Sequence, residues 1–204
     1  MAYLTESPGV LPNPEHLPLP LWPDPVASGE MDALRDMQRV MRADELRQKE
    51  AIRQVSNGVD LDIQRVLGIE ELGGFAATRE LIRTVLQITE RLGYIYKVRF
   101  ARPRPNAVDL GLRPFLSNPP HAAYPSNHTF QHFSVAQAFS RAIPEIRATQ
   151  ELFFVAQRTG ENREYAGLHY RSDTEVGKAM ASAFAPYLFQ VCRYKMRAVQ
   201  REWY

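Results

Sequence analysis

Apolar residues recur at intervals of three and four along most of this chain, and this spacing is the feature that most limits its fold. Between Phe75 and Ala101 they form one stripe, made of Leu81, Val85, Ile88, Leu92 and Ile95. Such a stripe lies on one face of an α-helix, because a helix turns once in about 3.6 residues. Pro103 and Pro105 follow, and proline cannot continue a helix. The segment therefore predicts a long amphipathic helix that ends before Pro103.

The N-terminal third of the chain carries a similar pattern. Apolar residues between Glu30 and Val55 alternate with charges at helical spacing, which predicts one continuous amphipathic helix. Asn57-Gly58 should end it, because glycine and asparagine readily adopt the conformations that stop a helix. A further short helix is expected at residues 61–67.

Three helices are expected in the C-terminal half. Residues 127–142 show helical spacing, and Pro144 suits the first turn of the next helix, which runs through Leu152 to Val155. Ser172 and Glu175 have the spacing of a capping box, so the last helix should begin there and continue toward the C-terminus. No segment has a convincing strand pattern or an internal repeat. The sequence therefore predicts an all-α, single-domain helical bundle.

Residues 1–27 should form an extended arm ahead of the helical domain at 28–204. Seven of the fifteen prolines lie between Pro8 and Pro25, and each proline fixes φ and removes a hydrogen-bond donor. The arm carries the apolar residues Leu17, Leu19, Leu21 and Trp22. We expect these side chains to pack on this subunit or on a neighbouring copy, which leaves a homo-oligomer possible.

Composition narrows the classes of function. The formal charge of +2 gives no reason to expect a nucleic-acid partner. Cys192 is the single cysteine, so no internal disulfide can form. The N-terminus lacks the features of a signal peptide, and the most apolar segment, residues 179–191, is too short to span a bilayer and contains Pro186. A soluble, cytoplasmic protein without an integral membrane segment is expected.

Two short segments supply groups that bind anions. Lys97 and Arg104 lie at the end of the long helix and in the turn after it, where both could face one point. Cations at a helix C-terminus also compensate the helix dipole, so these residues alone decide nothing. Ser126 precedes the helix of residues 127–142, and a helix N-terminus with a hydroxyl and free N–H groups is an anion site. On its own, Ser126 is equally well explained as a helix cap.

A third segment supplies a candidate nucleophile. The expected start of the last helix places His169 just before it and Asp173 in its first turn. The carboxylate can then accept the proton of one imidazole nitrogen and leave the other nitrogen free to attack. His128 and His132 are four residues apart and resemble a metal pair, but no third ligand stands at a persuasive spacing. We therefore expect no metal site.

Together the three segments resemble the signature of the type 2 phosphatidic acid phosphatase (PAP2) superfamily, K-x6-R-P, P-S-G-H and S-R-x5-H-x3-D. The family also includes soluble acid phosphatases and vanadium haloperoxidases, and its fold is an all-α bundle. The match runs from residue 97 to residue 177, and residues 160–173 resemble the soluble phosphatases beyond the bare motif. The resemblance implies a metal-independent phosphatase without a cofactor, acting on a small phosphate ester or other oxyanion.

The resemblance also implies roles for individual residues. His169 would form a phosphohistidine, Asp173 would fix its tautomer, and His128 would protonate the leaving group. The phosphoryl oxygens would be held by Lys97, Arg104, Ser126, Arg163 and the backbone N–H of Asn127. Two positions depart from the family pattern: Asn127 replaces a glycine, and Asn162 replaces a serine. We expect these changes to alter selectivity more than activity.

Two alternatives remain open. In a vanadium haloperoxidase the same pocket would bind vanadate, and His121, seven residues before His128, has a spacing that resembles the bromoperoxidases. The Arg102-Pro103 pair before Arg104 looks more like the soluble phosphatases. The other alternative is a catalytically silent helical protein that keeps the pocket for binding. The retained His169, His128 and Asp173 argue against it, because a scaffold needs none of them.

Overall fold

The computed structural model describes residues 13–56, 60–70 and 73–204, and in these residues it is all-α, without a strand. The helices predicted at residues 75–101 and 127–142 are both present, within one residue of the expected bounds. The helical elements are η1 (Pro14–His16), α1 (Glu30–Ala43), α2 (Glu45–Ser56), α3 (Asp60–Val66), α4 (Ala76–Phe100), α5 (Pro105–Val108), α6 (Asn127–Ala142), α7 (Ala148–Tyr165), α8 (Arg171–Val191) and α9 (Arg193–Trp203). None of these helices is both long enough and apolar enough to cross a membrane.

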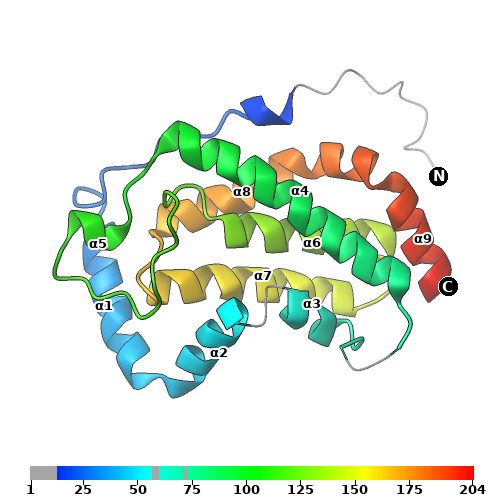
Figure 1. Ribbon diagram of the computed structural model, residues 1–204, viewed down its shortest axis with the longest axis horizontal. Coiled ribbons are helices and arrows are strands. Elements are labelled where there is room, and N and C mark those ends of the chain that lie inside the picture. Colours follow the sequence, from blue (N-terminus) through cyan, green and yellow to red (C-terminus); the bar gives the residue numbers. More distant parts are fainter. Residues whose placement is uncertain (1–12, 57–59, 71–72) are drawn as a thin grey trace.

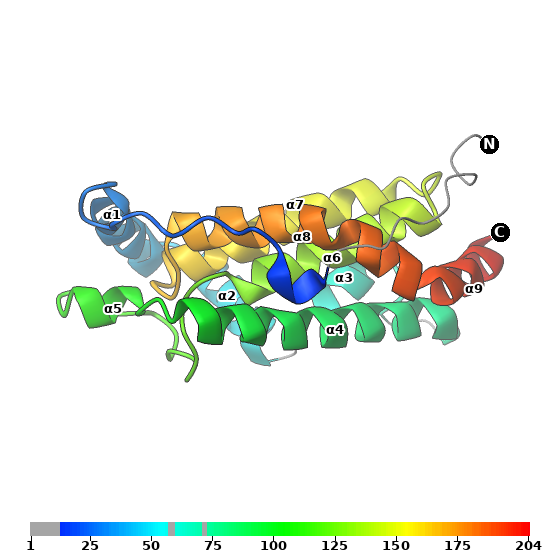
Figure 2. The same ribbon diagram turned by 90° about the horizontal axis from the view of Figure 1, so that it is seen from above.

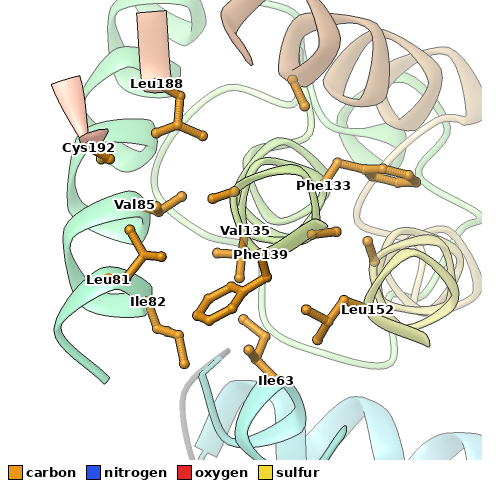
Figure 3. Packing of buried hydrophobic residues seen from close by; sticks show 14 of the residues in the cluster. Ile63, Leu81, Ile82, Val85, Phe133, Val135, Phe139, Leu152, Leu188 and Cys192 are labelled. Atoms are coloured by element: carbon orange, nitrogen blue, oxygen red, sulfur yellow. The ribbon is translucent and has the colours of Figure 1, made fainter. Parts of the chain in front are cut away.

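Helix α6 is the centre of the bundle. It packs against α4, α7, α8 and α9, which surround it in Figure 1, while Figure 2 shows α4 running along one side. Its apolar residues are accordingly buried on several faces, including Phe130, Val135 and Phe139. In the close view of Figure 3, Phe139 points toward residues of α4 and toward Ile63 of α3. Burying a side chain of this size stabilises the fold by about 2–3 kcal/mol.

The prediction of one helix from Glu30 to Val55 is wrong. The chain breaks at Asp44, whose φ of −100° and ψ of 86° are not helical, and α2 turns back at an angle to α1 (Figure 1). The Asp44 carboxylate accepts the backbone N–H of Arg47 at 2.9 Å and so caps α2. This local cap outweighs the continuous periodicity. Leu46 and Val55, two of the apolar residues in the pattern that predicted the single helix, are exposed. The predicted stop at Asn57-Gly58 lies outside the described residues.

Three predicted boundaries in the C-terminal half also differ. Pro144 lies in a turn and α7 begins four residues later, at Ala148. Helix α8 begins at Arg171, one residue before the predicted Ser172, because Asp173 and not Glu175 supplies the side chain that accepts the N-terminal amide. The chain then leaves the helix at Cys192, so α8 and α9 are separate helices.

The described part of the arm, from residue 13, lies along the bundle. It contains one short 3-10 turn, η1, and is otherwise extended. The Tyr96 hydroxyl of α4 accepts the Leu17 N–H at 2.5 Å and donates to the Pro14 carbonyl at 2.8 Å. The Trp22 ring contacts the rings of Phe100 and Tyr124. These contacts bring the chain to α1 on the side where α4 ends (Figure 2).

Candidate active site

The N-terminus of α8 holds a buried imidazole–carboxylate pair. His169 lies just before the helix and Asp173 in its first turn, and His169 Nδ1 is 3.0 Å from Asp173 Oδ2. The same oxygen accepts the Tyr170 N–H at 3.1 Å, and Oδ1 accepts Arg102 Nη1 at 2.6 Å. Burial raises the pKa of Asp173, while Arg102 and the Tyr170 N–H lower it. The carboxylate is therefore fixed from three directions.

The second ring nitrogen of His169 identifies the tautomer. Nε2 lies 3.2 Å from Nη1 of Arg104, and a guanidinium group can only donate. Nε2 must therefore carry a lone pair, and the ring proton sits on Nδ1, facing Asp173. Burial and the charges of Arg104 and Lys97 hold the pKa of His169 well below its usual range. The imidazole is consequently neutral, with its lone pair on Nε2.

The start of α6 meets the start of α8. The Ser126 N–H donates to the Asp173 carbonyl at 2.9 Å. This close approach requires Gly177, because a Cβ there would lie 2.6 Å from the Ser126 carbonyl oxygen. The Ser126 hydroxyl accepts that of Thr129 at 2.9 Å. The first residues of α6, Asn127 and His128, thereby lie beside His169 on the same cavity.

Arg163, in the last turns of α7, presents unpaired donors to this cavity. Its side chain is fully buried, and Nη2 donates to Gln54 Oε1 at 3.2 Å. Its Nε and Nη1 have no hydrogen-bond partner within the described part of the chain. Burial lowers the pKa of Arg163 to about 10, so the group stays cationic at neutral pH. A buried cation with free N–H groups is suited to an anionic ligand.

Lys97 and Arg104 converge on the segment before α6 and do not line the cavity. Lys97 Nζ donates to the carbonyls of Ala122, Ala123 and Pro125 at 2.6–2.9 Å. Arg104 donates to the carbonyls of His121, Ala122 and Leu168 besides contacting His169. Burial, followed by the charge of Arg104, lowers the pKa of Lys97 to about 7. Both cations thus support the segment before α6 from behind the cavity wall.

The cavity measures about 470 Å³. Five of the residues proposed from the sequence line it: His121, Asn127, His128, Arg163 and His169. Lys97, Arg104, Ser126, Asn162 and Asp173 do not belong to its lining. The other lining residues are Gln54, Val55, Glu90, Tyr94, Leu116, Ser117, Pro119, Gln131 and Leu168. A volume of this size is ordinary for a small-molecule site.

His121 is held at the edge of this cavity. Its Nδ1 lies 3.1 Å from Arg104 Nη2 and 3.2 Å from the Ala122 carbonyl oxygen, and its ring packs against the ring of Tyr94 in a T-shaped arrangement. Burial and the charges of Lys97 and Arg104 lower the pKa of His121 to about 4. The ring is therefore neutral.

Residues from the N-terminal helices reach the site unpredicted. Glu30 of α1 accepts Arg102 Nη2 at 3.0 Å, which links it through Arg102 to Asp173. Arg47 and Gln54 of α2 both bond the Asn162 side chain, at 3.0 and 3.2 Å. In the sequence the Arg102-Pro103 pair indicated only a resemblance to the soluble phosphatases, and it predicted no contact with Asp173. The available signal in the sequence was that Glu30, Arg47 and Gln54 are polar residues in a segment whose apolar residues predict a packed helix.

The histidines of α6 do not extend into a metal-binding set. His132 Nδ1 lies 2.9 Å from the carbonyl oxygen of His128, one helical turn away. In residues 13–56, 60–70 and 73–204, His, Cys, Asp and Glu side chains form no group of three that could hold a metal ion.

Fold and site together define an all-α protein in which one cavity is lined by a histidine bonded to a buried aspartate and by an arginine with two unpaired nitrogen donors. A sequence model of the PAP2 superfamily matches residues 80–197. This is more than half of the chain, which therefore belongs to the PAP2 superfamily. The matched region begins in α4 and ends in α9, so α1, α2 and α3 lie before it.

A solved structure supports the fold assignment. The chain resembles the transmembrane PAP2-type phosphatidylglycerolphosphate phosphatase from Bacillus subtilis with a TM-score of 0.53, over 84% of this chain and 88% of that one. Sequence identity is 14%, so the likeness shows the shared fold. No curated protein sequence matches this chain. Family membership supports a phosphatase-type activity.

Proposed function

We propose that this protein is a metal-independent phosphomonoesterase in which His169 is the nucleophile. The observation that carries the proposal is the neutral His169 imidazole, with its proton held by Asp173 at 3.0 Å and its lone pair on Nε2. Arg163 offers buried, unpaired N–H groups to the same cavity. A nucleophile beside an anion-binding cation is the arrangement that phosphoryl transfer requires.

In the first step Nε2 of His169 attacks phosphorus, and the bond from phosphorus to the ester oxygen breaks. The proton on Nδ1 stays with the ring, and Asp173 stabilises the positive charge that the ring acquires. Arg104 Nη1 lies 3.2 Å from Nε2, so its N–H group would be close to a phosphoryl oxygen once the new bond forms. Arg163 and the N-terminal N–H groups of α6 would hold the remaining oxygens.

His128 would donate the proton to the leaving oxygen. Burial, then the charge of Arg163, holds the pKa of His128 well below its usual range. A bound phosphate dianion offsets the charge of Arg163 and so favours protonated His128. In the second step His128 would take a proton from water, which attacks the phosphohistidine and releases inorganic phosphate. No metal ion takes part, since cationic side chains stabilise the transferred group.

His169→Ala tests this function. Hydrolysis of 4-nitrophenyl phosphate should fall by about three orders of magnitude or more, while the helical circular dichroism stays that of the parent protein. The parent should lose no activity on dialysis against EDTA and should be inhibited by vanadate, which resembles the transferred phosphoryl group. A His169→Ala protein with most of its turnover, or activity that returns only with added Mg²⁺ or Zn²⁺, would refute the mechanism.

His121 favours one second candidate, a vanadium haloperoxidase. It lines the cavity, where its imidazole could hydrogen-bond to a vanadate-bound oxygen, and vanadate would be held by the residues proposed to hold phosphate. Two assays on one preparation separate the candidates. We expect ready phosphomonoester hydrolysis as purified, and little bromination of monochlorodimedone with vanadate, peroxide and bromide. Rapid bromination with negligible hydrolysis would reverse this ranking.

A further inference from the structure

The cavity differs in character between its floor and its rim. The buried lining residues include Arg163, Asn127 and His169, which form the floor where the phosphoryl group is proposed to bind. The more exposed lining residues form the rim: Val55, Glu90, Tyr94, Leu116, Ser117 and Pro119. A substrate with its phosphoryl group on the floor must place its leaving alcohol at this rim.

The rim offers apolar and aromatic surface. Val55 and Tyr94 are 56% and 40% exposed, although both are large hydrophobic side chains. Leu116 and Pro119 come from the segment between α5 and α6, so the rim is built from α2, α4 and this segment. An apolar leaving group would cover these side chains and remove their surface from water.

The charged residues of the lining also disfavour a leaving group with a second anionic group. Arg163 is the single Lys or Arg among the described lining residues, and it lies on the floor. The charged residue of the rim is Glu90, whose carboxylate accepts from the Tyr94 hydroxyl at 3.5 Å. No salt bridge to Glu90 occurs among the described residues. A second anionic group on the leaving alcohol would therefore meet a carboxylate and no cation.

We infer that the substrates are phosphate monoesters of apolar or aromatic alcohols without a second anionic group, and that Glu90 enforces this choice. The inference rests on the proposed phosphatase function and adds the class of leaving group to it. Glu90 acts on the specificity of the reaction through its charge. Its carboxylate attracts a cationic leaving group and repels an anionic one.

Three aryl phosphates of matched shape test the inference. They carry an ethyl, a 2-aminoethyl or a 2-carboxyethyl group in the 4-position, so the charge varies while two methylene groups insulate it from the ester oxygen. We expect kcat/KM for the aminoethyl ester to exceed that for the carboxyethyl ester roughly five- to tenfold. The ethyl ester should lie between them, and raised salt should narrow the range.

Variants identify the source of the selectivity. Glu90→Gln should bring the aminoethyl to carboxyethyl ratio close to one, and Glu90→Lys should invert it. Glu151→Lys makes the same charge change at an exposed residue of α7 outside the cavity lining, and should leave the ratio as in the parent. The ratio is read within each variant, so a general loss of activity does not affect it.

The outcomes are distinct. Equal kcat/KM for the three esters, or a ratio that Glu90→Lys leaves unchanged, would overturn the inference while the phosphatase function stands. Hydrolysis of none of the three esters would refute the proposed function, and the inference with it. A carboxyethyl ester that is the best substrate would also overturn the inference, because the rim would then attract an anionic group.

Discussion

Gly93 of α4 leaves the space that the side chain of Asn127 fills at the start of α6. A Cβ built on Gly93 would lie 1.9 Å from Asn127 Oδ1, far inside van der Waals contact. Asn127 stands where the family pattern has a glycine. Its amide therefore adds bulk beside the proposed phosphoryl site, and the missing side chain of Gly93 accommodates it on the neighbouring helix.

Gly93→Ala should displace the Asn127 amide toward the cavity that it lines. Overpacking of this kind costs about 1–3 kcal/mol, and we expect a lower melting temperature together with a higher KM for 4-nitrophenyl phosphate. The double variant Gly93→Ala/Asn127→Gly should recover most of the parent's melting temperature and KM, because removing the Asn127 side chain makes room for the new Cβ. Thermal unfolding and steady-state kinetics measure the two effects.

Gly73→Ala is the control, since a Cβ at Gly73 meets nothing within 4 Å. It should change neither quantity appreciably. A double variant no better than Gly93→Ala alone would show that the two residues do not share this space functionally.

A second prediction concerns Gln54, which we regard as a positioning residue for Arg163. Its Oε1 accepts Arg163 Nη2 and Asn162 Nδ2, and its Nε2 donates to Asp62 Oδ2 at 3.2 Å. This anchoring turns the carbonyl oxygen to Arg163. Gln54→Met keeps the length of the side chain but removes the acceptor. We expect the inhibition constant for inorganic phosphate to rise about tenfold, as hydrogen bonds to charged groups contribute about 1.5–3 kcal/mol.

Gln131→Met is the matched control, because Gln131 lines the same cavity but donates to the Leu86 carbonyl. It should weaken phosphate inhibition much less. In an Arg163→Ala background the Gln54→Met change should have little further effect on the inhibition constant for phosphate, since its route to the phosphate is gone. Equal effects in both backgrounds would mean that Gln54 acts independently of Arg163.

The sequence predicts those parts of the fold and site that depend on local spacing. Helices α4 and α6 have strong periodicity and clear stops, and His169 and Asp173 meet because four residues across a helix start bring them together. Gln54 and Glu30 could not be placed in this way. Their partners are about 109 and 72 positions away in the chain, and no local pattern encodes such pairings.

The roles expected for Lys97 and Arg104 illustrate a different limit. The sequence indicated two cations near the site, and the structure has them there. The sequence did not indicate that the N–H groups of both residues would bond to backbone carbonyls of the segment before α6. That segment has no regular secondary structure, so its carbonyls need partners elsewhere. The cap at Asp44 shows the same priority of local hydrogen bonding over apolar periodicity.

A third prediction concerns the pH dependence of catalysis. Asp173 is faced by Arg102, by Lys97 of α4 and by His169, with Glu30 of α1 on the far side of Arg102. Burial raises the pKa of Asp173 and Arg102 opposes this. Arg102→Met removes the opposing charge, so Asp173 should take up a proton at higher pH and cease to hold the proton of His169 Nδ1.

The acid limb of the kcat/KM profile should therefore move upward by about one pH unit or more in Arg102→Met. Arg102→Lys, which keeps the charge but loses the fork geometry, should restore part of the shift. Profiles of the three proteins, measured with 4-nitrophenyl phosphate, provide the check. A loss of activity by the same factor at every pH would instead assign Arg102 a purely structural role.

The last prediction concerns stability, and it rests on Glu164, next to Arg163 in α7. Its side chain is 1% exposed, and Arg171 Nη1 lies 3.7 Å from Oε2, beyond hydrogen-bond distance. Burial raises the pKa of Glu164 from the ordinary 4.5 to about 7. The folded protein thus binds one more proton than the unfolded chain between these values. Its free energy of unfolding should fall as pH rises through this window, and the loss should be complete above pH 7.

Glu164→Gln keeps the shape and removes the titration. At pH 8 the variant should be more stable than the parent by on the order of 2 kcal/mol, and near pH 4.5 the two should be about equal. Urea denaturation at both pH values measures the difference. Glu175→Gln is the control, because Glu175 pairs with the same Arg171 at 2.6 Å but its side chain is 48% exposed. It should show no such dependence, and a Glu164→Gln protein less stable than the parent at pH 8 would mean that the buried carboxylate is stabilised by its surroundings.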